Sequence, residues 1–152
     1  MKKVLIVCSN YYPSTASLLK LDADKTLKKI KIKTRCIYVP GIFEIPVVIA
    51  RNIKKFDGFV ALGCVIKGQT PHFEYISRST FDALMNLSIY YKKPIGNGII
   101  TALNKLQVMQ RCGRPNSPLN KKKKGKGFEA ANAVVKVFKN DPKNWEKFFS
   151  KS

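Results

Sequence analysis

Apolar and polar residues follow one another along the chain in a pattern that predicts strands and helices in turn. Short apolar runs predict strands, and apolar residues repeated every three to four positions predict helices. The expected strands are residues 3–8, 31–39, 59–66 and 94–101. The expected helices are residues 14–30, 43–55, 71–91, 103–112 and a last helix with the apolar stripe Phe128, Ala131, Val134, Val135 and Phe138.

Alternation of strands and helices predicts an α/β fold with a four-stranded parallel sheet covered on both faces. We find no internal repeat and no linker, so residues 1–152 are expected to form one domain, with a basic loop at 113–125 and a C-terminal tail at 140–152. Ligands of such sheets bind outside the carboxyl ends of the strands. We therefore expect a site built from loops 9–13, 40–44 and 64–72 and from the region just after Asn97.

The loop after strand 59–66 contains the only histidine of the chain. Thr70 is expected to cap the following helix and Pro71 to occupy its first position. The free amides of residues 68–70 would then bind a phosphate or a similar anion. His72 would lie in the first helical turn, where the helix dipole favours a neutral imidazole that can take up a proton and pass it on. Since a lone histidine is more often structural than catalytic, both readings stay open here.

The net charge of +20, from 29 basic and 9 acidic residues, suggests a nucleic-acid partner at first sight. Only five of the 29 are arginine, the residue that reads bases and phosphates best. The lysines are spread over most of the chain, and the dense run 121–124, with Lys126, lies in a loop rich in Pro, Asn and Ser. We interpret the charge as a solvated lysine surface rather than a binding patch, and such a surface can still attract anionic substrates.

Composition excludes several other classes of protein. With 45% hydrophobic residues the chain is not disordered, and no apolar run approaches the roughly 20 residues of a membrane span. The N-terminal apolar run ends at Ser9, too early for a signal peptide, so we expect a cytoplasmic location. The cysteines are widely spaced, which indicates reduced thiols and neither disulfides nor a metal site. They are Cys8, Cys36, Cys64 and Cys112.

Four segments resemble, in order and spacing, the signature segments of the 6,7-dimethyl-8-ribityllumazine synthase family. They are Val-Pro-Gly-Ile-Phe-Glu-Ile-Pro at 39–46, and residues 62–76, 96–101 and 126–131. The resemblance implies a flavodoxin-like three-layer sandwich and a transferase of riboflavin biosynthesis. That family condenses 5-amino-6-(D-ribitylamino)uracil with 3,4-dihydroxy-2-butanone 4-phosphate to 6,7-dimethyl-8-ribityllumazine, the penultimate step, and uses no cofactor or metal.

The resemblance also implies roles for individual residues. Those matching the binding positions for the ribitylaminouracil are Tyr11, Ile42, Phe43, Glu44, Cys64, Val65, Ile66 and Asn97. Those matching the positions for the butanone phosphate are Gln69, Thr70, Arg111 and, near the site, Lys126. His72 matches the residue proposed for proton transfer. Ile42, Gln69 and Asn97 differ from the residues usual at these positions in the family. We expect these differences to affect the affinity for the substrates more than the chemical steps, because none of them removes a proton-transfer group.

The family builds its site between neighbouring subunits of a pentamer, with the stretch around Asn97 and Arg111 facing the neighbour's pocket. The resemblance therefore implies a homopentamer, and the sequence does not distinguish it from a decamer or a 60-subunit shell. Two alternatives remain at this point. One is a basic nucleic-acid-binding protein that reuses the fold, and the other is a shell-forming or flavin-binding assembly with impaired catalysis.

Overall fold

The computed structural model describes residues 1–113 and 124–140 of the chain. Its strands are β1 (Lys3–Ser9), β2 (Lys33–Val39), β3 (Gly58–Ile66) and β4 (Ile95–Ala102). Its helices are α1 (Pro13–Lys28), the short 3-10 helix η1 (Ile42–Glu44), α2 (Ile45–Asn52), α3 (His72–Tyr91), α4 (Lys105–Arg111) and α5 (Lys126–Lys139). Most of the predicted basic loop and nearly all of the predicted C-terminal tail lie outside the described residues.

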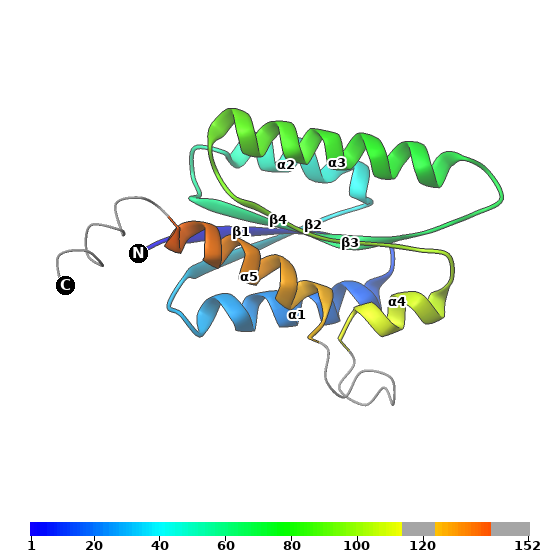
Figure 1. Ribbon diagram of the computed structural model, residues 1–152, viewed down its shortest axis with the longest axis horizontal. Helices are drawn as coiled ribbons and strands as arrows, with labels where there is room; N and C mark the ends of the chain where they lie inside the picture. Colours follow the sequence, from blue (N-terminus) through cyan, green and yellow to red (C-terminus); the bar gives the residue numbers. More distant parts are fainter. Residues whose placement is uncertain (114–123, 141–152) are drawn as a thin grey trace.

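The four strands form one parallel sheet in the order β2-β1-β3-β4. Helices α2 and α3 cover one face, and α1, α4 and α5 cover the other (Figure 1). The predicted three-layer α/β sandwich with a four-stranded parallel sheet is therefore confirmed. From β1 the chain moves to β2 on one side and then crosses to β3 on the other. The carboxyl ends of β1 and β3 thus flank the point where the strand order reverses, which is where such folds bind ligands.

The core consists of two apolar layers, one on each face of the sheet. Alternate residues of a strand point to opposite faces, so Leu5 and Phe59 pack with α2 and α3 while Ile6 and Leu62 pack with α1 and α5. All four side chains are fully buried. Burial on both faces explains why β1 and β3 are nearly continuous apolar runs with no polar alternation.

Several predicted element boundaries were wrong. The second strand begins at Lys33, two residues late, because Lys31 turns the chain with a positive φ of 63°. The predicted helix 43–55 is divided into η1 and α2, with Pro46 in the first turn of α2 as expected. The helix expected from residue 103 starts at Lys105, because the Asn104 side chain accepts a hydrogen bond of 3.0 Å from Gln107 N and caps it. Among the described residues, no helix is both long enough and apolar enough to cross a membrane.

Helix α5 lies so close to β4 that only glycine fits at position 96. A Cβ atom there would be 2.1 Å from the carbonyl oxygen of Ala130. We expect Gly96→Ala to lower the free energy of unfolding by about 1–3 kcal/mol, the usual cost of overpacking. Urea unfolding measures the loss, and Gly68→Ala is the matched control because a Cβ at Gly68 meets no atom within 4 Å. Equal unfolding midpoints for the two variants would contradict this close approach.

Candidate functional site

A hollow of about 200 Å³ lies at the carboxyl ends of β1 and β3. We call it the histidine hollow. Six residues predicted for the site line it, namely Tyr11, Ile42, Cys64, Val65, Ile66 and His72. They come from the β1–α1 loop, η1, the end of β3 and the start of α3, which are far apart in sequence. The prediction that the loops after the first three strands meet at one edge of the sheet is confirmed.

The loop after β1 presents an exposed aromatic ring at the mouth of this hollow. Tyr11 is 70% exposed, and its ring packs edge-to-face on Tyr12 with centroids 5.0 Å apart. The Tyr11 backbone N–H donates a hydrogen bond of 3.5 Å to the hydroxyl of buried Ser9. Because one edge of the ring is supported and the side chain remains open, Tyr11 offers a face on which a planar ligand can stack.

The loop after β2 forms a second wall through η1. The Gly41 N–H donates a hydrogen bond of 3.1 Å to Glu44 Oε2, which closes the start of η1. Ile42 is 3% exposed and packs against the backbone of Gly63. A Cβ atom added to Gly63 would lie only 3.0 Å from Ile42 Cγ2. Phe43 is 62% exposed and does not line the hollow. Of the three neighbours predicted for ligand binding, only Ile42 faces the histidine hollow, while Glu44 shapes the loop.

The end of β3 forms the floor of the hollow. Burial and, to a smaller extent, the nearby Cys112 raise the pKa of the Cys64 thiol to about 11. The thiol is therefore protonated near neutral pH and acts as a wall, since the thiolate is the nucleophilic form. Strand pairing continues past Ile66 because the Lys67 N–H donates a hydrogen bond of 2.9 Å to Ala102 O. All four cysteines are free, in agreement with the prediction of reduced thiols.

The turn between β3 and α3 places His72 at the first position of a 20-residue helix. The expectation that Thr70 caps this helix was wrong. The cap position is Pro71, no side chain caps the helix, and the Pro71 carbonyl accepts hydrogen bonds from the N–H groups of Glu74 and Tyr75. The helix starts one residue later than expected, so the Thr70 hydroxyl lies in the exposed turn with Gln69. A helix N-terminus without a side-chain cap retains donors for an anion.

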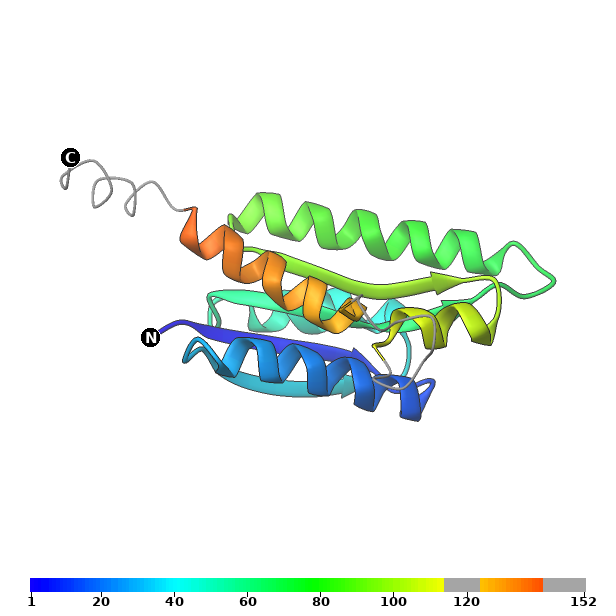
Figure 2. The same ribbon diagram turned by 60° about the horizontal axis from the view of Figure 1, so that its bottom comes forward.

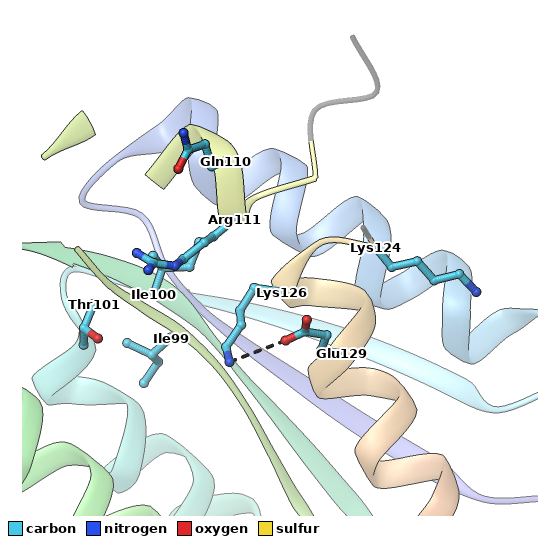
Figure 3. Close-up of a pocket in the computed structure, with 8 residues that line it drawn as sticks. All are labelled: Ile99, Ile100, Thr101, Gln110, Arg111, Lys124, Lys126 and Glu129. Atoms are coloured by element: carbon cyan, nitrogen blue, oxygen red, sulfur yellow. Dashed lines mark ion pairs between the residues drawn. The ribbon is translucent and has the colours of Figure 1, made fainter. Parts of the chain in front are cut away.

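A second hollow, of about 360 Å³, lies at the outer edge of β4. We call it the arginine hollow. It is lined by Ile99, Ile100 and Thr101 of β4, by Gln110 and Arg111 at the end of α4, and by Lys124, Lys126 and Glu129 around the start of α5. Arg111 and Lys126 project over β4, whereas Lys124 extends away from them (Figure 3). Lys126 Nζ lies 3.6 Å from Glu129 Oε2. Three cations against one carboxylate make this hollow attractive to an anion.

The two hollows share no lining residue, and His72 and Arg111 line different ones. The expectation that the region after Asn97 lies at the carboxyl edge was wrong, because β4 continues to Ala102 and Asn97 pairs with Ala61 in mid-sheet. Asn97 is exposed, and its Oδ1 accepts a hydrogen bond of 3.0 Å from Ile99 N.

Sequence reasoning missed two residues that shape the site. Ser9 is 3% exposed, lines the histidine hollow and holds the Tyr11 backbone. The sequence could have indicated Ser9, because it directly follows a buried apolar run and therefore lies where a parallel strand ends. Glu129 pairs with Lys126, three residues earlier on α5, and the Lys-x-x-Glu spacing could have indicated this contact.

Comparison with known proteins gives one consistent result. The family model described as 6,7-dimethyl-8-ribityllumazine synthase matches residues 1–141. A protein of that name from Bartonella tribocorum is 38% identical over 139 residues, covering 90% of this chain and 89% of the relative. One from Bartonella henselae is 40% identical over 138 residues, covering 88% and 85%. One from Renibacterium salmoninarum is 41% identical over 104 residues, covering 68% and 65%.

Proposed function

Because the chain belongs to the 6,7-dimethyl-8-ribityllumazine synthase family, we propose that it catalyses the reaction for which this family is named. It condenses 5-amino-6-(D-ribitylamino)uracil with 3,4-dihydroxy-2-butanone 4-phosphate in the penultimate step of riboflavin biosynthesis. The observation that carries the proposal is the histidine hollow, where six residues expected for this chemistry line one space at the switch point of the sheet.

The chemistry needs orientation of two substrates and movement of protons. Imine formation, loss of phosphate and ring closure release phosphate and water, and each step transfers protons between the reactants. Holding both substrates in reactive geometry can supply about 7–11 kcal/mol of the barrier. A positioned acid or base contributes about 100-fold or more. The hollow supplies a shaped space and one imidazole, which is what this sequence of steps requires.

We assign the uracil to the wall formed by Tyr11 and the end of β3. The Tyr11 ring is open on one side for stacking. The backbone at Val65 and Ile66 lies beside it and can pair with the edge of a flat polar ring. Because the Cys64 thiol stays protonated, it contributes shape and no covalent step. In this arrangement His72 lines the same hollow as the ring.

We assign the phosphate of the second substrate to the turn containing Gln69 and Thr70. This turn leads into α3, whose amides and dipole favour an anion at the N-terminus. His72 is the next residue but one after Thr70, so a proton held by its imidazole lies beside the leaving phosphate. In this role His72 moves protons beside the phosphate, whose negative charge the turn stabilises.

We further propose that Arg111 and Lys126 of one subunit complete the histidine hollow of a neighbour in a homopentamer. The proposal rests on the separation of the two hollows in one chain. It is supported by large apolar side chains left exposed on η1, α2 and α3, a typical mark of a protein interface. They include Phe43, Val47, Met85 and Ile89. With four free cysteines, the enzyme is expected to work in the reducing cytoplasm.

The test of the function is turnover by the purified wild-type protein. With both substrates present, we expect absorbance of the lumazine product to rise together with release of inorganic phosphate. Omission of either substrate should abolish both signals. Absence of product at saturating concentrations of both substrates would reject the proposal and leave an assembly with impaired catalysis as the alternative. Salt-sensitive binding of nucleic acid, with no turnover, would favour the basic binding protein.

A further inference from the structure

The chain leaves α4 and enters α5 at almost the same point, beside α1. Figure 2 shows these three helices side by side on one face of the sheet. Gly113 follows the end of α4, and Gly125 directly precedes α5. A Cβ atom added to Gly113 would lie 3.1 Å from Gly125 Cα, and one added to Gly125 would lie 2.7 Å from Gly113 Cα. Gly113 also has a positive φ of 79°, which favours glycine.

The side chain of Asp22, on α1, fills the space beside these two glycines. Its Oδ2 atom would lie 2.6 Å from a Cβ at Gly113 and 3.0 Å from a Cβ at Gly125. A side chain at either position would therefore crowd the carboxylate. Asp22 is half-buried, and burial raises the pKa of its carboxyl against a smaller opposite effect of Lys25. The carboxyl thus lies partly out of water, against both glycines.

Two cations of the arginine hollow lie next to the same point. Arg111 is two residues before the first glycine, and Lys126 directly follows the second. Both line the arginine hollow and project over β4 (Figure 3). Helix α4 has only seven residues, and the cap residue of α5 is a glycine, which has no side chain to hold the helix start. The spacing of the two cations therefore depends on contacts from outside these helices, and Asp22 lies against both ends.

We propose that Asp22 is a positioning residue, which sets the distance between the end of α4 and the start of α5 and so holds Arg111 and Lys126 together around a phosphate. This inference rests on the proposed function, in which the arginine hollow receives the phosphate of a substrate. Asp22 lines neither hollow, so it acts through the backbone and does not touch the ligand. A misplacement of about 1 Å far from the chemistry can cost about 100-fold in rate, so a small change of this distance is measurable.

Charge and position predict opposite effects when this carboxylate is removed. A carboxylate repels an anion, so on charge alone its loss would tighten phosphate binding. If Asp22 acts as a spacer, Asp22→Ala leaves a gap in which the two chain ends can shift, and phosphate binding weakens. Asp22→Asn removes the charge but keeps the shape, so it should bind phosphate at least as tightly as the wild type. The direction of the change therefore separates positioning from a general electrostatic effect.

The test is the Kd of inorganic phosphate, measured by isothermal titration calorimetry on the full-length protein without substrates. We expect Arg111→Ala to raise this Kd about tenfold or more. Asp22→Ala should raise it about three- to tenfold, less than the loss of a direct hydrogen bond to a charged group. Alanine is the best helix former, so this variant keeps α1 intact.

Asp24→Ala is the matched control. It removes the same charge from the same helix, but the Asp24 carboxylate forms an ion pair of 2.6 Å with Lys28 and accepts a hydrogen bond of 2.5 Å from Thr34 Oγ1. Its loss should lower the stability of the protein without raising the Kd of phosphate. A rise in Kd as large as that of Asp22→Ala would show that any damage to α1 weakens the arginine hollow, and would overturn the proposal.

Steady-state kinetics give a second readout. Asp22→Ala should raise the KM for the butanone phosphate and leave kcat within about twofold, because a loss of binding common to ground state and transition state raises KM alone. The proposal fails if Asp22→Ala binds phosphate as tightly as the wild type, if Asp22→Asn loses as much affinity as Asp22→Ala, or if neither the wild type nor Arg111→Ala shows phosphate binding at this hollow. Phosphate binding that depends on Asp22 in a protein without turnover would reject the proposed function and leave the role of Asp22 standing.

Discussion

Replacing His72 with alanine is expected to lower kcat for lumazine formation about 100-fold or more, the usual contribution of a positioned acid or base. His72 is the only histidine of the chain and lines the hollow at the switch point of the sheet. Cys64 cannot replace it, because its pKa of about 11 keeps the thiol protonated. The KM values of both substrates should change little, since the imidazole acts on protons and contributes little to binding. Initial rates over a grid of the two substrates separate kcat from KM.

Tyr75→Ala is the matched control for this variant. Tyr75 lies on the same helix, is 70% exposed and does not line the histidine hollow. It should leave kcat within about twofold of wild type, because it touches none of the proposed machinery. If His72→Ala retains full kcat while the wild-type enzyme is active, the proton-transfer role of His72 is wrong and positioning alone supplies the rate.

Arg111→Ala is expected to raise the KM for the butanone phosphate about 10- to 100-fold. A hydrogen bond to a charged group is worth about 1.5–3 kcal/mol, and about 1.4 kcal/mol corresponds to a factor of ten. The KM for the ribitylaminouracil should change little, because the guanidinium recognises the phosphate. Steady-state kinetics with each substrate varied in turn distinguish the two constants.

The control for Arg111 removes a similar charge elsewhere. Arg35 is exposed on β2 and lines neither hollow, so Arg35→Ala tests whether the lysine- and arginine-rich surface attracts the phosphate in a general way. Arg35→Ala should keep both KM values near wild type at physiological salt, where exposed charges are screened beyond about 8 Å. An equal rise in both variants would point to general attraction and against a specific phosphate contact at Arg111.

The parts of the fold that follow from burial were predictable from sequence. Strand β3 is continuous and apolar because both of its faces are covered, which identified it as a central strand. A turn and a helix start directly after such a strand then placed His72 at the binding edge of the sheet. The same reasoning brought the loops containing Tyr11 and Ile42 to that edge, and all three residues line one hollow.

The parts that depend on exact register or on neighbours were not predictable in the same way. The region just after Asn97 was expected at the carboxyl edge of the sheet, but Asn97 pairs with Ala61 in the middle of β4, which ends at Ala102. Thr70 was expected to cap α3, and a shift of one residue moved that position to Pro71. Phe43 has the sequence context of a core residue, but its side chain is 62% exposed in the single chain.

Because the two hollows are separate in one chain, we propose that each active site takes His72 from one subunit and Arg111 from the next. The most direct measurement is lumazine formation by mixed assemblies of His72→Ala and Arg111→Ala chains, co-expressed with different tags and purified through both tags. In a closed ring of equal, randomly placed chains, about a quarter of the interfaces would pair an intact His72 with an intact Arg111. We predict that the mixed assemblies regain about a quarter of wild-type turnover at low butanone phosphate, far above either variant alone. If the mixed assemblies are no more active than the average of the two separate variants, the site is not shared, and His72 and Arg111 act in the same subunit.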